Sequence, residues 1–184
     1  MAIPEIRIAD PAFNVSAIID LMDRAAKAGA LLVTFPKLGL SCDDLFHQHF
    51  LLDAFLEALA KVLEASVKFP VIAAVGLPLQ VDSLIFNCGA VIYRGRLLGL
   101  APKSYLPNYR EFYELRQFTP GDVAIRKSID LLGQHGIPFA NRLLFQVEEQ
   151  PLFTFFVEIC EDLWVPVPPS SCAALVNATL LINQ

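Results

Sequence analysis

The stretch LFTFFVEICEDLW, residues 152–164, changes character at Cys160. Aromatic and β-branched residues dominate positions 152–159, a composition typical of a buried β-strand. The residues that follow Cys160 suit a short helical turn instead. Open α/β sheets gather their functional residues at such strand ends. Together with the helices and strands predicted along the rest of the chain, the stretch indicates an α/β domain with Cys160 as a candidate site residue.

The first half of the chain predicts two helices separated by strands. Asn14 can cap a helix that covers residues 15–28, and Asp43 or Asp44 can cap a longer one whose leucines fall at helical spacing. Short runs that are almost wholly apolar indicate buried strands. Such runs lie at residues 31–35 and 71–76.

The second half is rich in strand patterns. Two apolar runs are broken by Arg94-Gly95-Arg96, which predicts a β-hairpin with its turn at Gly95. A polar and aromatic segment follows, and it predicts a loop with a short helical turn. The remaining predicted elements are a short helix near Ser170 and a strand over residues 178–183.

The composition supports a folded domain that works on small molecules. Of the 184 residues, 55% are hydrophobic and 18% are charged, so the chain forms one domain or part of one. The net charge of −5 argues against a nucleic-acid surface, which needs clustered Lys and Arg.

The sequence also suggests a cytoplasmic protein. The first residues lack the basic and apolar regions of a signal peptide. The apolar runs are shorter than the roughly 20 residues that a membrane span needs. The four cysteines have no CxxC spacing and no His or Cys cluster suggests a metal, so free thiols are expected.

Three predicted strand ends carry reactive side chains: Lys37, Lys103 and Cys160. A helical turn and a nearby cation would favour the thiolate of Cys160, although a buried structural cysteine is as compatible with the local pattern. Lys103 could stabilise a developing oxyanion, but a surface lysine is the simpler interpretation of its local sequence.

Other cysteines and aromatic residues are interpreted as structural. Cys88 lies within an apolar strand pattern and is expected in the core. Cys172 is expected to be packed in a helix, and Trp164 is expected to be buried, as aromatic side chains usually are. Cys42 is next to two acidic residues, which disfavour a thiolate.

Longer motifs raise the weight of the functional interpretation. The segments FPKLGL, KSYLPNYREFYE and CEDLWVP resemble, in this order, the glutaminase domain of glutamine-dependent NAD synthetases. That domain belongs to the nitrilase, or carbon–nitrogen hydrolase, superfamily. DLFHQ and FTPGD fit the same family. The segments begin at Phe35, Lys103, Cys160, Asp44 and Phe118.

The resemblance implies a nitrilase-type αββα sandwich, an α/β fold that is incomplete here at both ends. Residues 1–184 would be a truncated carbon–nitrogen hydrolase (glutaminase) domain, with the synthetase domain absent. The implied activity is hydrolysis of the glutamine amide, which supplies ammonia for NAD synthesis. No cofactor is expected in this domain, because ATP and Mg would belong to the synthetase domain. The implied partners are glutamine, the ammonia-receiving synthetase domain and further copies of the chain in a homo-oligomer.

The resemblance also assigns roles to individual residues. Cys160 would be the nucleophile that forms a thioester, and Lys103 would stabilise the tetrahedral oxyanion. Tyr109 and Glu114 match substrate-binding positions. Lys37 occupies the position of the family's general base, which is a glutamate.

Lys37 opens two alternatives to a working glutaminase. An ammonium cannot accept the thiol proton unless its pKa is strongly depressed, as a second lysine nearby could achieve. The first alternative is therefore a catalytically inactive fragment of this domain. The second is another nitrilase-type amidase, although the KSYLPNYREFYE and CEDLWVP segments favour the glutaminase.

Overall fold

The computed structural model describes residues 1–40 and 45–184. Within these residues the helices are α1 (Pro11–Lys27), α2 (His49–Ser66) and α3 (Pro169–Leu175). The strands are β1 (Leu32–Thr34), β2 (Ile72–Val81), β3 (Leu84–Tyr93), β4 (Arg96–Pro102), β5 (Ser128–Leu131), β6 (Gln134–Pro138), β7 (Leu144–Val147), β8 (Gln150–Glu158) and β9 (Leu180–Asn183). Three single turns of 3₁₀-helix are η1 (Glu114–Arg116), η2 (Gly121–Val123) and η3 (Cys160–Leu163).

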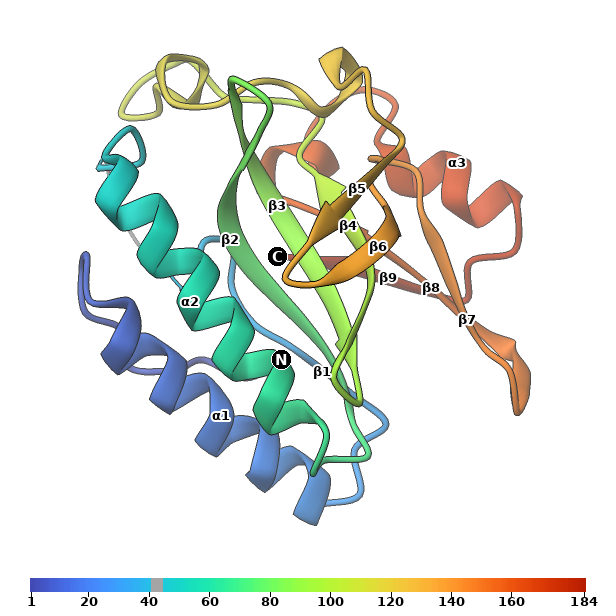
Figure 1. Cartoon of the computed structure of the whole chain (residues 1–184). Helices are drawn as coiled ribbons and strands as arrows, with labels where there is room; N and C mark the ends of the chain where they lie inside the picture. Colours follow the sequence, from blue (N-terminus) through green and yellow to red (C-terminus); the bar gives the residue numbers. More distant parts are fainter. Residues whose placement is uncertain (41–44) are drawn as a thin grey trace.

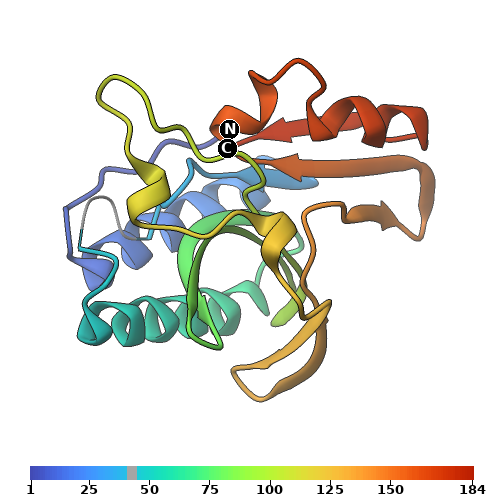
Figure 2. The ribbon, with the colours of Figure 1, turned by 90° about the horizontal axis from the view of Figure 1, so that it is seen from above.

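Two sheets and three helices form four layers. The first sheet has the strand order β1-β2-β3-β4, and α1 and α2 cover its outer face (Figure 1). The second sheet, β7-β8-β9, lies behind it with α3 on its far side (Figure 2). The layer order is helix, sheet, sheet, helix, so the αββα architecture expected from the resemblance is confirmed.

Two apolar layers hold the sandwich together. One lies between the helices and the first sheet and includes Ile18 of α1, Leu59 of α2 and Phe86 of β3. The other lies between the two sheets and includes Ala74 and Val157. Because both faces of β2 are covered, its sequence is almost continuously apolar, which is the pattern from which a buried strand was predicted.

The predicted start of the first helix is wrong by one turn. Asp10, and not Asn14, caps α1, since its side chain accepts a hydrogen bond from the Phe13 N–H. Asn14 is fully buried inside the helix, where its amide bonds to Arg7 and to the carbonyl of Leu40. The predicted caps Asp43 and Asp44 lie outside the described residues, and α2 begins at His49.

The predicted hairpin at Gly95 is confirmed. Arg94 and Gly95 have φ angles of 45° and 80°, the left-handed backbone that a two-residue turn of this kind requires. The turn is tied to the end of α2, because the Gly95 N–H donates to the hydroxyl of Ser66.

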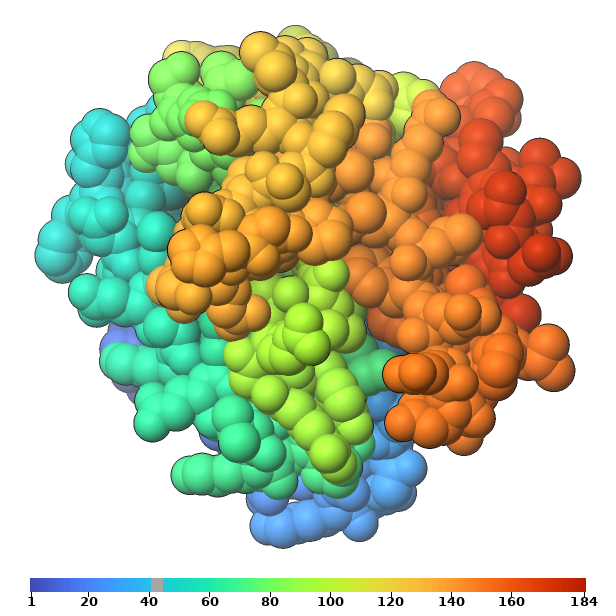
Figure 3. Space-filling model, turned by 45° about the vertical axis from the view of Figure 1, so that its right-hand side comes forward, coloured from blue at the N-terminus to red at the C-terminus, as the bar shows by residue number. Residues whose placement is uncertain are grey.

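Three strands and two exposed side chains differ from the sequence analysis. Strands β5, β6 and β7 were not predicted, because each is only four or five residues long. The β5–β6 hairpin lies against β4 on the surface (Figure 3), and an isolated bridge joins Leu100 to Phe139. Trp164 is 74% exposed and Cys172 is also exposed, so neither is packed as expected. None of the helices in the described part of the chain could span a membrane.

Gly76 of β2 is the place where the sheet touches the segment that carries Lys37. A Cβ atom there would lie 2.4 Å from the Leu38 nitrogen and 2.8 Å from the Lys37 Cα. At Gly99 of β4 an added Cβ would instead meet the side chains of Leu143 and Phe145. The backbone of Lys37 and Leu38, which the Cβ at position 76 would meet, has less room to adjust than the side chains of Leu143 and Phe145.

Gly76→Ala is therefore expected to lower the free energy of unfolding by about 1–3 kcal/mol, and by more than the control Gly99→Ala. Chemical denaturation of both variants measures the difference. Equal losses, or no loss at Gly76, would contradict the tight contact beneath Lys37.

Candidate active site

Four side chains with reactive groups meet at one end of the sandwich. Lys37 follows β1, Lys103 follows β4 and Cys160 follows β8, while Glu114 comes from η1 in the loop after β4. The Phe35 N–H bonds to the Ala74 carbonyl and so continues the pairing of β1 with β2 up to this point. The structure thus brings together the three strand ends that the sequence singled out.

The carboxylate of Glu114 joins the two lysines. Its Oε1 accepts from Lys37 Nζ at 2.7 Å, and its Oε2 accepts from Lys103 Nζ at 2.5 Å. The side chain of Lys103 is 0% exposed and that of Glu114 is 12% exposed. A buried ammonium is costly without an anionic partner, so Glu114 is what allows Lys103 to be charged inside the protein.

Lys37 is the more accessible of the two lysines, with 28% of its side chain exposed. Burial acts to lower its pKa, but the hydrogen bond and the charge of Glu114, followed by contact with Cys160, raise it above the ordinary value. Lys103 therefore does not depress the pKa of Lys37, because the carboxylate of Glu114 lies between the two ammonium groups. Lys37 is an ammonium at neutral pH and cannot accept the thiol proton.

Cys160 is held in an unusual backbone conformation at the start of η3. Its φ angle is 48°, which is rare for a residue with a side chain. Its N–H donates to the Gln184 carbonyl at 2.9 Å, and its carbonyl accepts from Asn183 Nδ2 at 3.1 Å. Because β9 pairs in parallel with β8, its last residue and the residue after it lie beside the end of the strand that leads to Cys160.

Asp162 connects the loop after β4 to the turn that carries Cys160. One of its carboxylate oxygens accepts from the N–H groups of Ser104 at 3.0 Å and Tyr105 at 2.8 Å. The other accepts from the Ile159 N–H at 3.1 Å. Ser104 follows Lys103 and Ile159 precedes Cys160, so a single buried carboxylate sets the separation of the two functional groups.

Comparisons with known proteins agree with this geometry. No protein-family model matches the chain. It is 43% identical over 179 residues to a glutamine-dependent NAD(+) synthetase of Mycobacterium tuberculosis, a match that covers 96% of this chain and 26% of that protein. A solved glutamine-dependent NAD(+) synthetase from Cytophaga hutchinsonii superposes with a TM-score of 0.80 at 23% identity, over 98% of this chain and 29% of the other.

A nitrilase-superfamily amidase from Nesterenkonia is also similar in fold. One solved variant of it, with a glutamate replaced by leucine, carries the acetamide moiety of fluoroacetamide on its active-site cysteine. That structure has a TM-score of 0.70 and 18% identity, over 98% of this chain and 62% of the amidase.

The chain is a nitrilase-fold relative of the glutamine-dependent NAD(+) synthetases. It spans about a quarter of the length of the curated relatives that it matches. The resemblance inferred from the motifs is thus confirmed, and the four-layer fold is that of the nitrilase superfamily.

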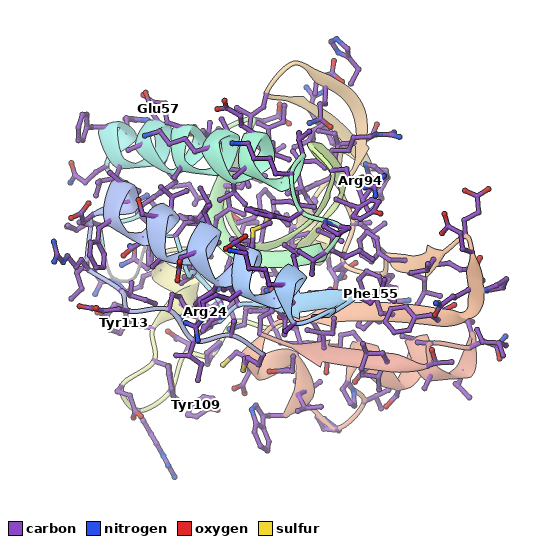
Figure 4. All side chains as sticks on the ribbon, turned by 90° about the horizontal axis from the view of Figure 1, so that it is seen from below. Arg24, Glu57, Arg94, Tyr109, Tyr113 and Phe155 are labelled. Atoms are coloured by element: carbon purple, nitrogen blue, oxygen red, sulfur yellow. The ribbon has the colours of Figure 1, made fainter. Side chains whose placement is uncertain are left out.

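Tyr109 lies near the cluster but does not belong to its core. Its hydroxyl donates to both carboxylate oxygens of Glu161 at 3.0 Å, and this hydrogen bond is the main reason that its pKa is raised. Its side chain is half exposed, and Figure 4 shows it at the outer edge of the molecule. Tyr109 therefore contacts Glu161, the residue after Cys160. Its contact with glutamine stays a prediction.

A hollow of about 270 Å³ opens beside the cluster. Lys37 and Glu114 line it together with Phe112 and the aromatic side chains of the adjoining loop. Within residues 1–40 and 45–184, no group of three or more His, Cys, Asp or Glu side chains is placed to hold a metal ion. The reactive groups that the cluster brings together are a thiol, two ammonium groups and a carboxylate.

Sequence analysis missed the residues that position the cluster. Asp162, Asn183 and Gln184 were not proposed as site residues, because each acts through backbone hydrogen bonds that cross between elements far apart in the chain. The acidic pair after Cys160 was the available signal for Asp162, since a short acidic side chain in a first helical turn often bonds to backbone N–H groups.

Cys160 is expected to react with iodoacetamide before Cys172, although Cys172 is more exposed. Cys160 is partly buried and lies beside the Lys37 ammonium, an electropositive setting of the kind in which cysteines react readily, while burial raises the pKa of Cys88 and keeps that thiol inert. Mass mapping after brief treatment gives the order. Cys42 lies outside the described residues.

Lys37→Met is expected to slow the labelling of Cys160 several-fold. The labelling rate of Cys172, which serves as the internal control, should stay unchanged. Faster labelling of Cys88 or Cys172 than of Cys160, or a Lys37→Met variant that labels normally, would contradict this description of the thiol.

Asp162 should make stability fall as the pH rises from about 4 to about 6. Burial raises its pKa to about 6 from 3.8, against the lowering effects of three backbone N–H groups and Lys103. The folded state then binds a proton that the unfolded state has released, so ionisation costs up to about 3 kcal/mol above this window.

Urea denaturation of the wild type and of Asp162→Asn across pH 4–7 isolates this effect. The variant loses a backbone hydrogen bond at every pH. Its free energy of unfolding should not show the additional fall between pH 4 and pH 6 that is expected for the wild type. Parallel pH profiles for the two proteins would show that Asp162 does not titrate in this range.

Proposed function

We propose that this chain is the carbon–nitrogen hydrolase (glutaminase) part of a glutamine-dependent NAD synthetase. Its reaction would be hydrolysis of the side-chain amide of glutamine at Cys160. The observation that supports this most is that Asp162 ties the backbone after Lys103 to the backbone before Cys160, while Glu114 pairs with the buried Lys103 ammonium.

In this reaction the Cys160 thiolate attacks the amide carbon and the C=O electrons move onto oxygen. Lys103 donates a hydrogen bond to that oxyanion, and its burial strengthens the interaction because little water competes with it. The C–N bond then breaks, the nitrogen takes up a proton and leaves as ammonia, and a thioester remains. Water attacks the thioester to release glutamate and return the thiol.

The ammonia would pass to a synthetase domain like that of the relatives, which would also hold the ATP and Mg. The proposal requires no cofactor in residues 1–184. We also propose that the protein is cytoplasmic and forms a homo-oligomer. Unpaired cysteines fit a reducing compartment, and the exposed apolar side chains of Leu175, Leu180 and Leu181 fit a subunit interface.

A second candidate, a catalytically inactive domain, is favoured by the state of Lys37. The proton on the Cys160 thiol needs an acceptor, and Lys37, which lies beside Cys160, is already protonated. Glu114 contacts both lysines and is held by them. Loss of a general base typically reduces a rate by about 10²- to 10⁴-fold.

Ammonia release from glutamine, measured against a Cys160→Ala control, tests the proposed reaction. The wild type is expected to release ammonia slowly, and Lys37→Glu is expected to raise the rate by at least about 100-fold, since it restores a proton acceptor. Asp23, which pairs with the exposed Lys27, offers a control in Asp23→Asn, whose rate should match the wild type.

Two outcomes would overturn the proposal. A Lys37→Glu protein that is folded but as slow as Cys160→Ala would exclude a glutaminase that lacks only its base. Faster release from simple amides such as acetamide than from glutamine would instead indicate another nitrilase-type amidase.

A further inference from the structure

The polar groups around the Cys160 sulfur are matched to an anion. Lys37 lies beside Cys160, and Lys103 ends at the same carboxylate as Lys37. An ammonium has three N–H donors and no acceptor. Both oxygens of Glu114, the acceptor between them, are already engaged by the two lysines. A ligand placed between Cys160 and the two lysines would therefore meet ammonium donors.

An amide and a carboxylate fit this arrangement differently. When the terminal carbon of a ligand lies at the Cys160 sulfur and one oxygen faces Lys103, its second group faces Lys37. In an amide that group is an NH₂ donor, which would oppose the N–H donors of Lys37. In a carboxylate it is an oxygen, which can accept from Lys37 in a charge-assisted hydrogen bond.

The net charge of the cluster points in the same direction. Lys37, Lys103 and Glu114 together carry +1 while the thiol is neutral. A glutamate at position 37 would make the same cluster −1. The carboxylate of Glu161 lies nearby, but it is exposed to solvent in part and engaged by Tyr109, so its repulsion is screened.

Lys37 is also reachable. More than a quarter of its side chain is exposed, and it lines the hollow beside the cluster together with Phe112 and Glu114. A ligand can thus contact the Lys37 ammonium without displacing its ion pair with Glu114.

We propose that the site binds the side-chain carboxylate of an acidic amino acid of glutamate size in preference to the corresponding amide. Lys37 is the residue that sets this preference. The proposal rests on the proposed function in one respect, namely that a side chain of glutamine length reaches Cys160. Its consequence is that glutamate, the product of amide hydrolysis, is retained by the site and competes with glutamine.

Isothermal titration calorimetry with the Cys160→Ala protein tests the preference without turnover. L-Glutamate is expected to bind at least about tenfold more tightly than L-glutamine at pH 7.5 and low salt, the scale of one charge-assisted hydrogen bond. Lys37→Met in the same background should abolish the preference and Lys37→Glu should reverse it. Lys27→Met, at an exposed lysine far from the cluster in the chain, is the matched charge control and should change neither affinity.

The outcomes separate this inference from the proposed function. Tighter binding of glutamine, or a preference for glutamate that persists in a folded Lys37→Glu protein, overturns the inference and leaves the glutaminase proposal in place. No binding of either amino acid to a protein with an unchanged thermal melt overturns both.

Discussion

The two-sided ion pair of Glu114 with Lys37 and Lys103 is the interaction on which the site depends. Lys103 is wholly buried, and a buried ammonium without a partner would either lose its proton or destabilise the fold. The carboxylate of Glu114 gives the buried Lys103 its anionic partner and at the same time keeps Lys37 protonated. The carboxylate that accompanies the buried Lys103 thus also prevents Lys37 from acting as a base.

The two sheets are joined near the cluster by hydrogen bonds as well as by apolar packing. The side-chain amide of Gln184 donates to the backbone carbonyls of Phe35 and Ala74, which belong to β2 and to the segment that continues β1. The backbone carbonyl of Gln184 accepts a hydrogen bond from the Cys160 N–H. A residue at the end of the second sheet therefore fixes both Cys160 and the segment that leads to Lys37. Together with Asp162, it makes the separation of the reactive groups a property of the sandwich and not of flexible loops.

The apolar pattern and the motifs were sufficient for the framework but not for the electrostatics. Buried strands such as β2 and β8 were predictable because their composition reflects burial on both faces. Strands β5 to β7 were not, because each is only four or five residues long and its pairing with the adjacent strand is interrupted by a register shift. The motifs marked Lys37 as a departure from the family's glutamate, but only the structure shows that Glu114 decides its protonation state.

A direct measurement of the Lys37 pKa tests the central claim that Glu114 holds this lysine as an ammonium beside Cys160. Lysine side chains labelled at Cε can be followed by NMR through a pH titration, with Lys37→Arg used to assign the signal. The account predicts a midpoint above 10.5 for Lys37 and a lower midpoint in Glu114→Gln. A midpoint near neutral pH in the wild type would contradict it, because Lys37 would then be available as a base.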